Sequence, residues 1–251
     1  MAEDMSIQSY LSQGGKLTNP TNVPPRYRAE LMKIMATFVD SELAGAAGFA
    51  DVINAAPGIK ERIAAAKIVL EKTDNAGQVL RLLGEFGADT ARYANSHPWT
   101  ARLPRNAPVG SSRSEHDMRL SVLNYPLDGW VDAVVMNLSM GLAVGVQLDE
   151  LTRISYQPLA ETIRGIAPVE ARHVELAEEG LARLIEQEKT PELTVSLEYW
   201  RPRVAAIFGE ASSGRFEQLS GWGLRHRSNA ALLQDWNDRM DAALTRLGLT
   251  G

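Results

Sequence analysis

The sequence contains no cysteine. This absence excludes a disulfide, thiolate catalysis and a zinc–thiolate site, so any bound metal must use oxygen and nitrogen ligands. The chain also lacks an excess of basic residues, because its formal charge is −5 and its isoelectric point is near 5.5. We therefore expect no nucleic-acid partner, since phosphate binding needs a concentrated basic surface.

Two further absences concern location and fold class. The first residues are polar and acidic, and no apolar run is long enough to span a bilayer, so we expect a cytoplasmic protein with no membrane partner. No segment shows the alternating pattern of a strand, whereas apolar residues recur at steps of three and four along most of the chain. These patterns predict an all-α protein.

The predicted helices belong to one domain. Residues 1–24 are expected to form an irregular arm, followed by a single helical domain over residues 25–251. Helices are predicted over residues 27–53, 59–86, 126–154, 158–188 and 191–208, and Ser228 caps a last helix that ends at Gly248. Segment 126–154 is apolar on every face, which indicates a buried central helix. Pro168 predicts a kink or restart of the fourth helix, with Gly165 as the break.

The most informative motif is the sequence Glu170-Ala-Arg-His173. Residues three apart in a helix project from one face, so Glu170 and His173 can bind the same ion. Di-iron bundles use this motif on two helices together with a Glu from each of two others. A lone copy also occurs on many solvated helices, so a surface pair is the alternative. Glu42 and Asp132 lie among apolar residues of their helices, where a carboxylate needs a partner.

Four long helices with such clusters, and one long crossover at residues 89–124, are the pattern of a ferritin-like four-helix bundle with additional C-terminal helices. Short segments spread from about residue 26 to residue 249 resemble the phenylacetic acid catabolic family, in particular its phenylacetyl-CoA epoxidase catalytic subunits. The similar segments are residues 41–45 (SELAG), 74–78 (DNAGQ), 124–126 (NYP), 130–132 (WVD), 170–173 (EARH) and 222–225 (WGLR), followed by Ser228 and Asn229.

This resemblance implies a carboxylate-bridged di-iron oxygenase subunit that epoxidises an aromatic acyl-CoA with companion subunits and a reductase. Carried over by position, the implied metal ligands are Glu42, Asp132, Glu170 and His173. The second helix departs from the family pattern, because Asn75 and Gln78 stand where the catalytic subunit has a Glu and a His. A neutral amide is at best a weak oxygen donor. Glu71 or Asp74, on the same helix, are the alternative donors there.

The implied ligand set contains three carboxylates, Glu42, Asp132 and Glu170. Their negative charge needs compensation by a metal ion, a buried proton or a cation such as Arg172. One divalent ion held by Asp132, Glu170 and His173 is one solution, since two carboxylates and a histidine bind iron in mononuclear oxygenases. The cofactor is therefore one iron ion, two ions or none.

Three functions stay open at this point. The first is a phenylacetyl-CoA epoxidase-like oxygenase subunit with an altered metal site. The second is a non-catalytic structural subunit that pairs with a complete di-iron homologue in a homo- or hetero-oligomer. The third is a metal-free bundle that binds a ligand.

Basic and aromatic residues suggest where partners bind. An acyl-CoA needs cations for its phosphates. Trp200 and Trp222, each close to arginines, are candidates for a subunit interface, with core packing as the alternative. The phosphate candidates, with ordinary surface charge as the alternative, are Lys67, Lys72, Arg102 and Arg105.

Overall fold

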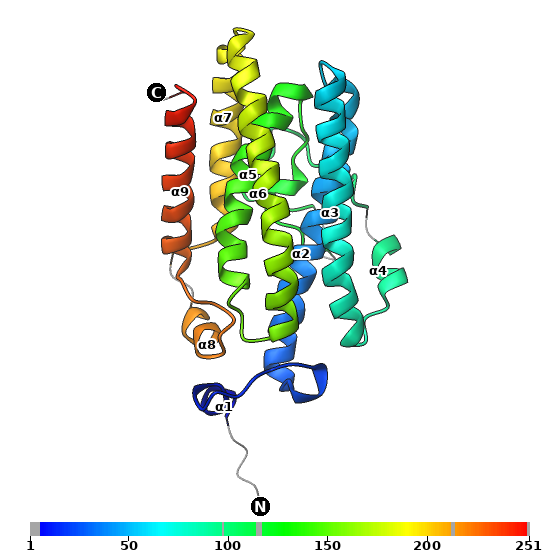
Figure 1. The fold of residues 1–251 in the computed structure, drawn as a ribbon, viewed down its shortest axis with the longest axis vertical. Helices are drawn as coiled ribbons and strands as arrows, with labels where there is room; N and C mark the ends of the chain where they lie inside the picture. Colours follow the sequence, from blue (N-terminus) through cyan, green and yellow to red (C-terminus); the bar gives the residue numbers. More distant parts are fainter. Residues whose placement is uncertain (1–5, 97, 114–116, 212–213, 250–251) are drawn as a thin grey trace, which may run out of the picture.

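The computed structural model describes residues 6–96, 98–113, 117–211 and 214–249. Two helical hairpins form its centre: α2 (Pro25–Val52) packs along α3 (Ile59–Glu85), and α5 (Gly129–Leu151) packs along α6 (Gln157–Glu186) (Figure 1). Helix α3 also lies against α6, whereas α2 and α5 touch each other much less. The described residues contain no strand, so the predicted all-α, ferritin-like bundle is confirmed.

Helix α5 is the central helix, as its apolar sequence predicts. Helices α6, α7 (Thr190–Ala205) and α9 (Asn229–Arg246) pack around it, and the largest buried side chains there are Trp200 and Trp236. Among the described helices, α5 is the one long and apolar enough to cross a membrane, and 72% of its apolar window is buried inside the protein. That burial is typical of the core helix of a soluble protein.

Two glycines let α5 and α6 approach closely. A Cβ atom added at Gly141 on α5 would lie 2.8 Å from Cγ2 of Val174 on α6. Gly180 on α6 faces α5 in the same way, because an added Cβ there would lie 3.0 Å from Cγ1 of Val134 on α5. Each branched side chain therefore fills the space that a glycine leaves on the facing helix.

The long crossover between α3 and α5 is held against α2 by side chains that anchor its backbone. It contains α4 (Thr90–Ser96) and a 3-10 turn, η3 (Ser121–Asn124). Buried Asp40 on α2 accepts a hydrogen bond from the Tyr93 hydroxyl on α4 and one from the backbone N–H of Met118. The Ser41 hydroxyl accepts another from the N–H of Leu120. These bonds attach α4 and the segment before η3 to α2.

Several element boundaries agree with the predicted ones to within a few residues, but the fourth helix differs from its prediction. Ser228 caps α9 by accepting from the N–H of Ala231, as expected. The expected break at Gly165 is absent, because α6 continues as one α-helix through Pro168. Buried residues on both sides of the proline, including Ile166 and Glu170, hold the helix in place by packing.

The N-terminal arm is more ordered than the sequence indicated. Its described part holds α1 (Ile7–Ser12) and a 3-10 turn, η1 (Pro20–Asn22), and Leu17 between them is buried and forms an isolated bridge with Tyr156. At the other end, α7 runs into η4 (Ala206–Phe208), and α8 (Phe216–Gly221) precedes α9. A last short turn, η2 (Ile53–Ala55), follows α2.

Candidate functional site

The centre of the bundle holds a lysine ammonium between two glutamates. Nζ of Lys72 on α3 lies 3.1 Å from Oε1 of Glu42 on α2, and 3.1 and 2.9 Å from Oε1 and Oε2 of Glu170 on α6. All three residues are buried, with at most 8% of their surface exposed. The ammonium therefore occupies the space between the carboxylates that the resemblance assigns to metal ions.

Neighbouring residues on α2 and α3 complete this arrangement. Asn75, one turn after Lys72, donates from its amide to Oε1 of Glu170 at 3.0 Å and more weakly to Oε2 of Glu42 at 3.4 Å. Gly45 lies beside the lysine stem, where an added Cβ would meet Cδ of Lys72 at 3.6 Å. The stem thus reaches the centre of the bundle past a position without a side chain.

His173 joins the cluster through its neighbours on α3 and α6. Its Nε2 atom lies 2.8 Å from a carboxylate oxygen of Glu71, and its Nδ1 atom lies 3.4 Å from Oε2 of Glu170 without a hydrogen bond. Helix α5 contributes Asn137, whose amide donates to the backbone carbonyl of His173. The cluster therefore draws one residue or more from each of the four bundle helices.

Burial and mutual charge set the protonation of this cluster. Burial and the neighbouring Glu170 carboxylate raise the pKa of Glu42 to about 8, even though Lys72 acts against them. Burial also disfavours the charge of Glu170, but Lys72 and His173 outweigh it and hold the Glu170 pKa below its ordinary value. Lys72 is buried too, yet the two carboxyls raise its pKa. At neutral pH the two carboxyl groups therefore share one proton and carry one negative charge, which the Lys72 ammonium balances. The Glu42–Lys72–Glu170 group has no net charge.

Asp132 does not join this group. It lies near the start of α5 and accepts two hydrogen bonds from Arg105 of the crossover, one from Ser196 and one from the Trp200 indole of α7, and one from the N–H of Asp128. Burial alone would raise the pKa of Asp132, but these donors together lower it. Its role here is to fix the crossover and α7 to α5.

The other residues singled out by the sequence fall outside the cluster. Gln78 donates to Asp74. Arg172 is not the compensating cation: it is exposed and pairs with Glu175 and Glu179. Lys72 was expected only as a phosphate ligand, although it lies on the buried face of its helix with Ile68, four residues before it, and Asn75, three residues after it. That spacing is the signal that could have identified it.

The four cations proposed for acyl-CoA phosphates all have partners. Lys67 pairs with Glu71, Lys72 is enclosed by glutamates, Arg102 donates to backbone carbonyls and Arg105 holds Asp132. Trp200 is fully buried inside the chain, so the interface suggested for it is wrong. Trp222 is partly buried and packs near Tyr27.

These residues do not fit the di-iron centre that the resemblance implies. Both glutamates already accept from the ammonium, and an amide stands where a bridging carboxylate is required. His173 offers one free ring nitrogen, which alone does not hold an ion. Within the described ranges, no group of three or more His, Asp or Glu side chains is arranged to hold a metal ion.

The family comparison agrees with this architecture. A family model described as phenylacetic acid catabolic protein, PaaA/PaaC, matches residues 5–251. The chain belongs to this family. No curated protein matches the chain. The PaaA/PaaC family includes di-iron proteins, and its members function in multi-subunit complexes. In this PaaA/PaaC member the bundle is kept, but the Lys72 ammonium lies between Glu42 and Glu170, two residues that the resemblance assigns to metal binding.

Proposed function

We propose that this chain is a metal-free, non-catalytic cytoplasmic subunit that pairs with a PaaA/PaaC relative carrying a complete ligand set. The observation that carries the proposal is the Lys72 ammonium, within 3.1 Å of both Glu42 and Glu170. A covalently attached cation supplies positive charge to the buried carboxylates without any metal.

The charge balance supports this proposal over an oxygenase with an altered site. A divalent ion between Glu42 and Glu170 would add two positive charges to a group that one ammonium and one proton on the carboxyl pair already leave uncharged. Iron binding would thus require Lys72 to leave or lose its proton, and its raised pKa opposes that loss. A mononuclear iron site would need Asp132 beside Glu170 and His173. Asp132 instead accepts hydrogen bonds from Arg105, Ser196 and Trp200, which speaks against such a site.

Co-purification with a relative that carries two Glu-x-x-His motifs tests the proposal. The relative is tagged and expressed with this chain or with its His173→Ala variant. We expect a stable complex with iron in the relative alone. Supplied with acyl-CoA substrate, a reductase and its electron donor, both preparations should consume oxygen at the same rate. Loss of oxygen consumption in the variant complex, with assembly intact, would place the chemistry in this chain and overturn the proposal. Failure of the wild-type chain to form the complex would overturn it as well.

A further inference from the structure

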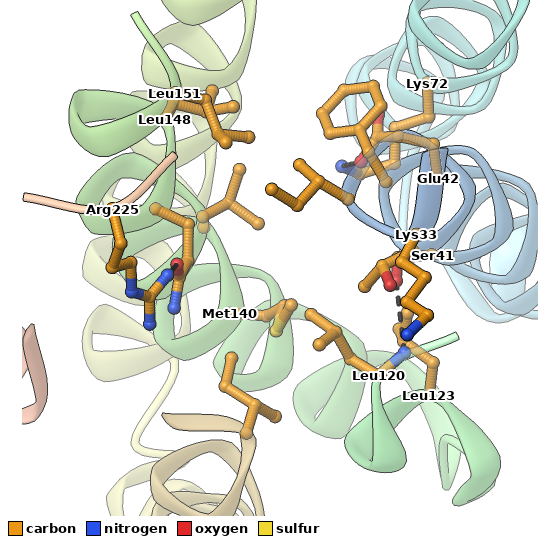
Figure 2. A pocket seen from close by; sticks show the side chains of 18 of the residues that line it. Lys33, Ser41, Glu42, Lys72, Leu120, Leu123, Met140, Leu148, Leu151 and Arg225 are labelled. Carbon is orange, nitrogen blue, oxygen red and sulfur yellow. Dashed lines mark hydrogen bonds and ion pairs between the residues drawn. The ribbon is translucent and has the colours of Figure 1, made fainter. Parts of the chain in front are cut away.

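A cavity of about 390 Å³ lies between α2 and α5, beside the Glu42–Lys72 pair. This volume falls within the range of small-molecule sites. Figure 2 shows Leu148, Leu151 and Met140 on one side of the opening, and Glu42, Lys72 and Ser41 on the other. The lining is mostly apolar and extends along α2 from Glu30 to Phe49. Its shape and composition suit an elongated apolar molecule.

Charged groups on the cavity wall favour an anion. The lining includes Lys33, Lys72, Arg215 and Arg225 as cations, but only Glu30 and Glu42 as carboxyl groups. This excess of positive charge contrasts with the net charge of −5 for the whole chain. Lys33 and Arg215 both pair with Glu30. Lys72 is committed to the central cluster.

Arg225 differs from these cations because its hydrogen bonds go to neutral groups. Its guanidinium donates to the amide oxygens of Gln147 at 3.1 Å and of Asn229 at 2.9 Å. The nearby Glu150 carboxylate accepts from Arg153 and Arg227, and from the backbone N–H groups of His226 and Arg227, so its acceptor positions are taken.

A partly buried guanidinium without a carboxylate partner costs free energy. Among the described residues no ion pair of Arg225 within 4 Å is found, and burial lowers its pKa despite the charge of Glu150. Arg225 can donate five hydrogen bonds in all, of which two are used here. An anionic ligand group would therefore be stabilised at this point of the cavity wall.

We propose that the cavity binds a medium-chain alkyl carboxylate, with its head group on Arg225 and its chain along the apolar wall past Met140. A carboxylate matches the planar guanidinium fork and brings the single negative charge that Arg225 lacks. A phosphate monoester carries more charge, and the neighbouring cations Lys33 and Arg215 are already shared with Glu30. This inference rests on the cavity and not on the proposed function, so either can fail alone.

Calorimetric titration of the full chain with decanoate, 1-decanol and decylamine tests it without any variant. The three probes share one apolar chain and differ in the charge of the head. We expect saturable binding of one decanoate per chain, and affinity for decanol roughly ten- to a hundredfold weaker, because a hydrogen bond to a charged group is lost. Decylamine should bind more weakly still. No saturable binding of decanoate, or equal affinity for decanoate and decanol, would overturn the proposal.

Two variants locate the site. Arg225→Gln should reduce decanoate affinity to that of decanol and leave decanol binding unchanged, whereas Met140→Trp should block both by filling the cavity. Arg62→Gln, which removes an exposed arginine on α3 away from the cavity, is the matched charge control. Circular dichroism verifies that each variant is folded. Retained preference for decanoate in folded Arg225→Gln protein would overturn the assignment of the head group.

Discussion

Replacement of Lys72 by Met tests whether the ammonium neutralises the central carboxylates. At pH 7 the change leaves Glu170 buried beside Glu42 without its cation. The cheapest response of the protein is to protonate Glu170. Taking up a proton at pH 7 on a carboxyl with an ordinary pKa of 4.5 costs about 3 kcal/mol. That figure agrees with the ~3–5 kcal/mol typical of breaking a buried ion pair.

The penalty should depend on pH in a predictable direction. In the wild type the Glu170 pKa is lowered, so its contribution to stability is present above the unfolded pKa and is lost as the pH falls. Without Lys72 the pKa is raised, so stability is highest below the unfolded pKa and is lost as the pH rises. The cost of Lys72→Met should therefore shrink to below about 1 kcal/mol at pH 5.

Urea unfolding followed by circular dichroism, with a chelator present, measures this cost at both pH values. The matched control is Lys67→Met, which removes an exposed lysine on the same helix and should change the free energy of unfolding by at most ~0.5 kcal/mol. Adding Glu170→Gln to Lys72→Met should restore most of the loss. If Lys72→Met costs under ~1 kcal/mol at pH 7, or the same at both pH values, the charge argument is refuted.

Three further predictions concern other parts of the cluster and bundle. Because the Glu42 pKa is raised to about 8, the wild type loses stability as the pH rises from 4.5, where the carboxyl ionises in the unfolded chain but keeps its proton in the fold. The unfolding free energy of Glu42→Gln should thus rise by on the order of 3 kcal/mol relative to that of the wild type between pH 5 and 8, and an unchanged difference would contradict this. Asp132→Asn should lower the unfolding free energy by about 2 kcal/mol at pH 7, which is less than for a fully buried ion pair because Arg105 is a third exposed. This loss should disappear in acid, where Asp132 of the wild type is protonated as well. An equal loss at pH 3 would be inconsistent with the lowered pKa of Asp132. Gly141→Ala should lower the unfolding free energy by ~1–3 kcal/mol, because the added methyl lies too close to α6. Gly165→Ala is the control: its methyl meets no atom within 4 Å, so it should raise the unfolding free energy by up to ~1 kcal/mol. Equal effects of the two variants in thermal unfolding would argue against close packing at Gly141.

The helices were predictable from the sequence because their apolar periodicity is strong. The polar cluster was predictable in part: Glu42, Asn75, Glu170 and His173 do meet at the centre of the bundle. They share buried helix faces, and residues on such faces converge when helices pack. Asp132 was assigned to this group, but it lies more than one helical turn before Asn137, the α5 residue that contacts His173.

The identity of the compensating cation could not be deduced from periodicity alone. Arg172 follows the motif directly, yet a neighbour in sequence points to a different face of the helix, and Arg172 is exposed. Lys72 lies on another helix, about 100 residues earlier, and its role depends on how closely α3 packs against α2 and α6. The continuity of α6 through Pro168 is likewise decided by packing on both sides of the proline.

The iron content of the purified chain tests the central claim most directly. The protein is expressed with iron supplied, purified without chelator or metal-affinity tag, and measured by elemental analysis beside a Lys72→Leu, Asn75→Glu, Gln78→His variant. We predict essentially no iron in the wild-type chain, alone or in complex with its relative after subtraction of the relative's own iron. One or two iron ions per wild-type chain would contradict the account, because the metal would then have to displace Lys72 from Glu42 and Glu170.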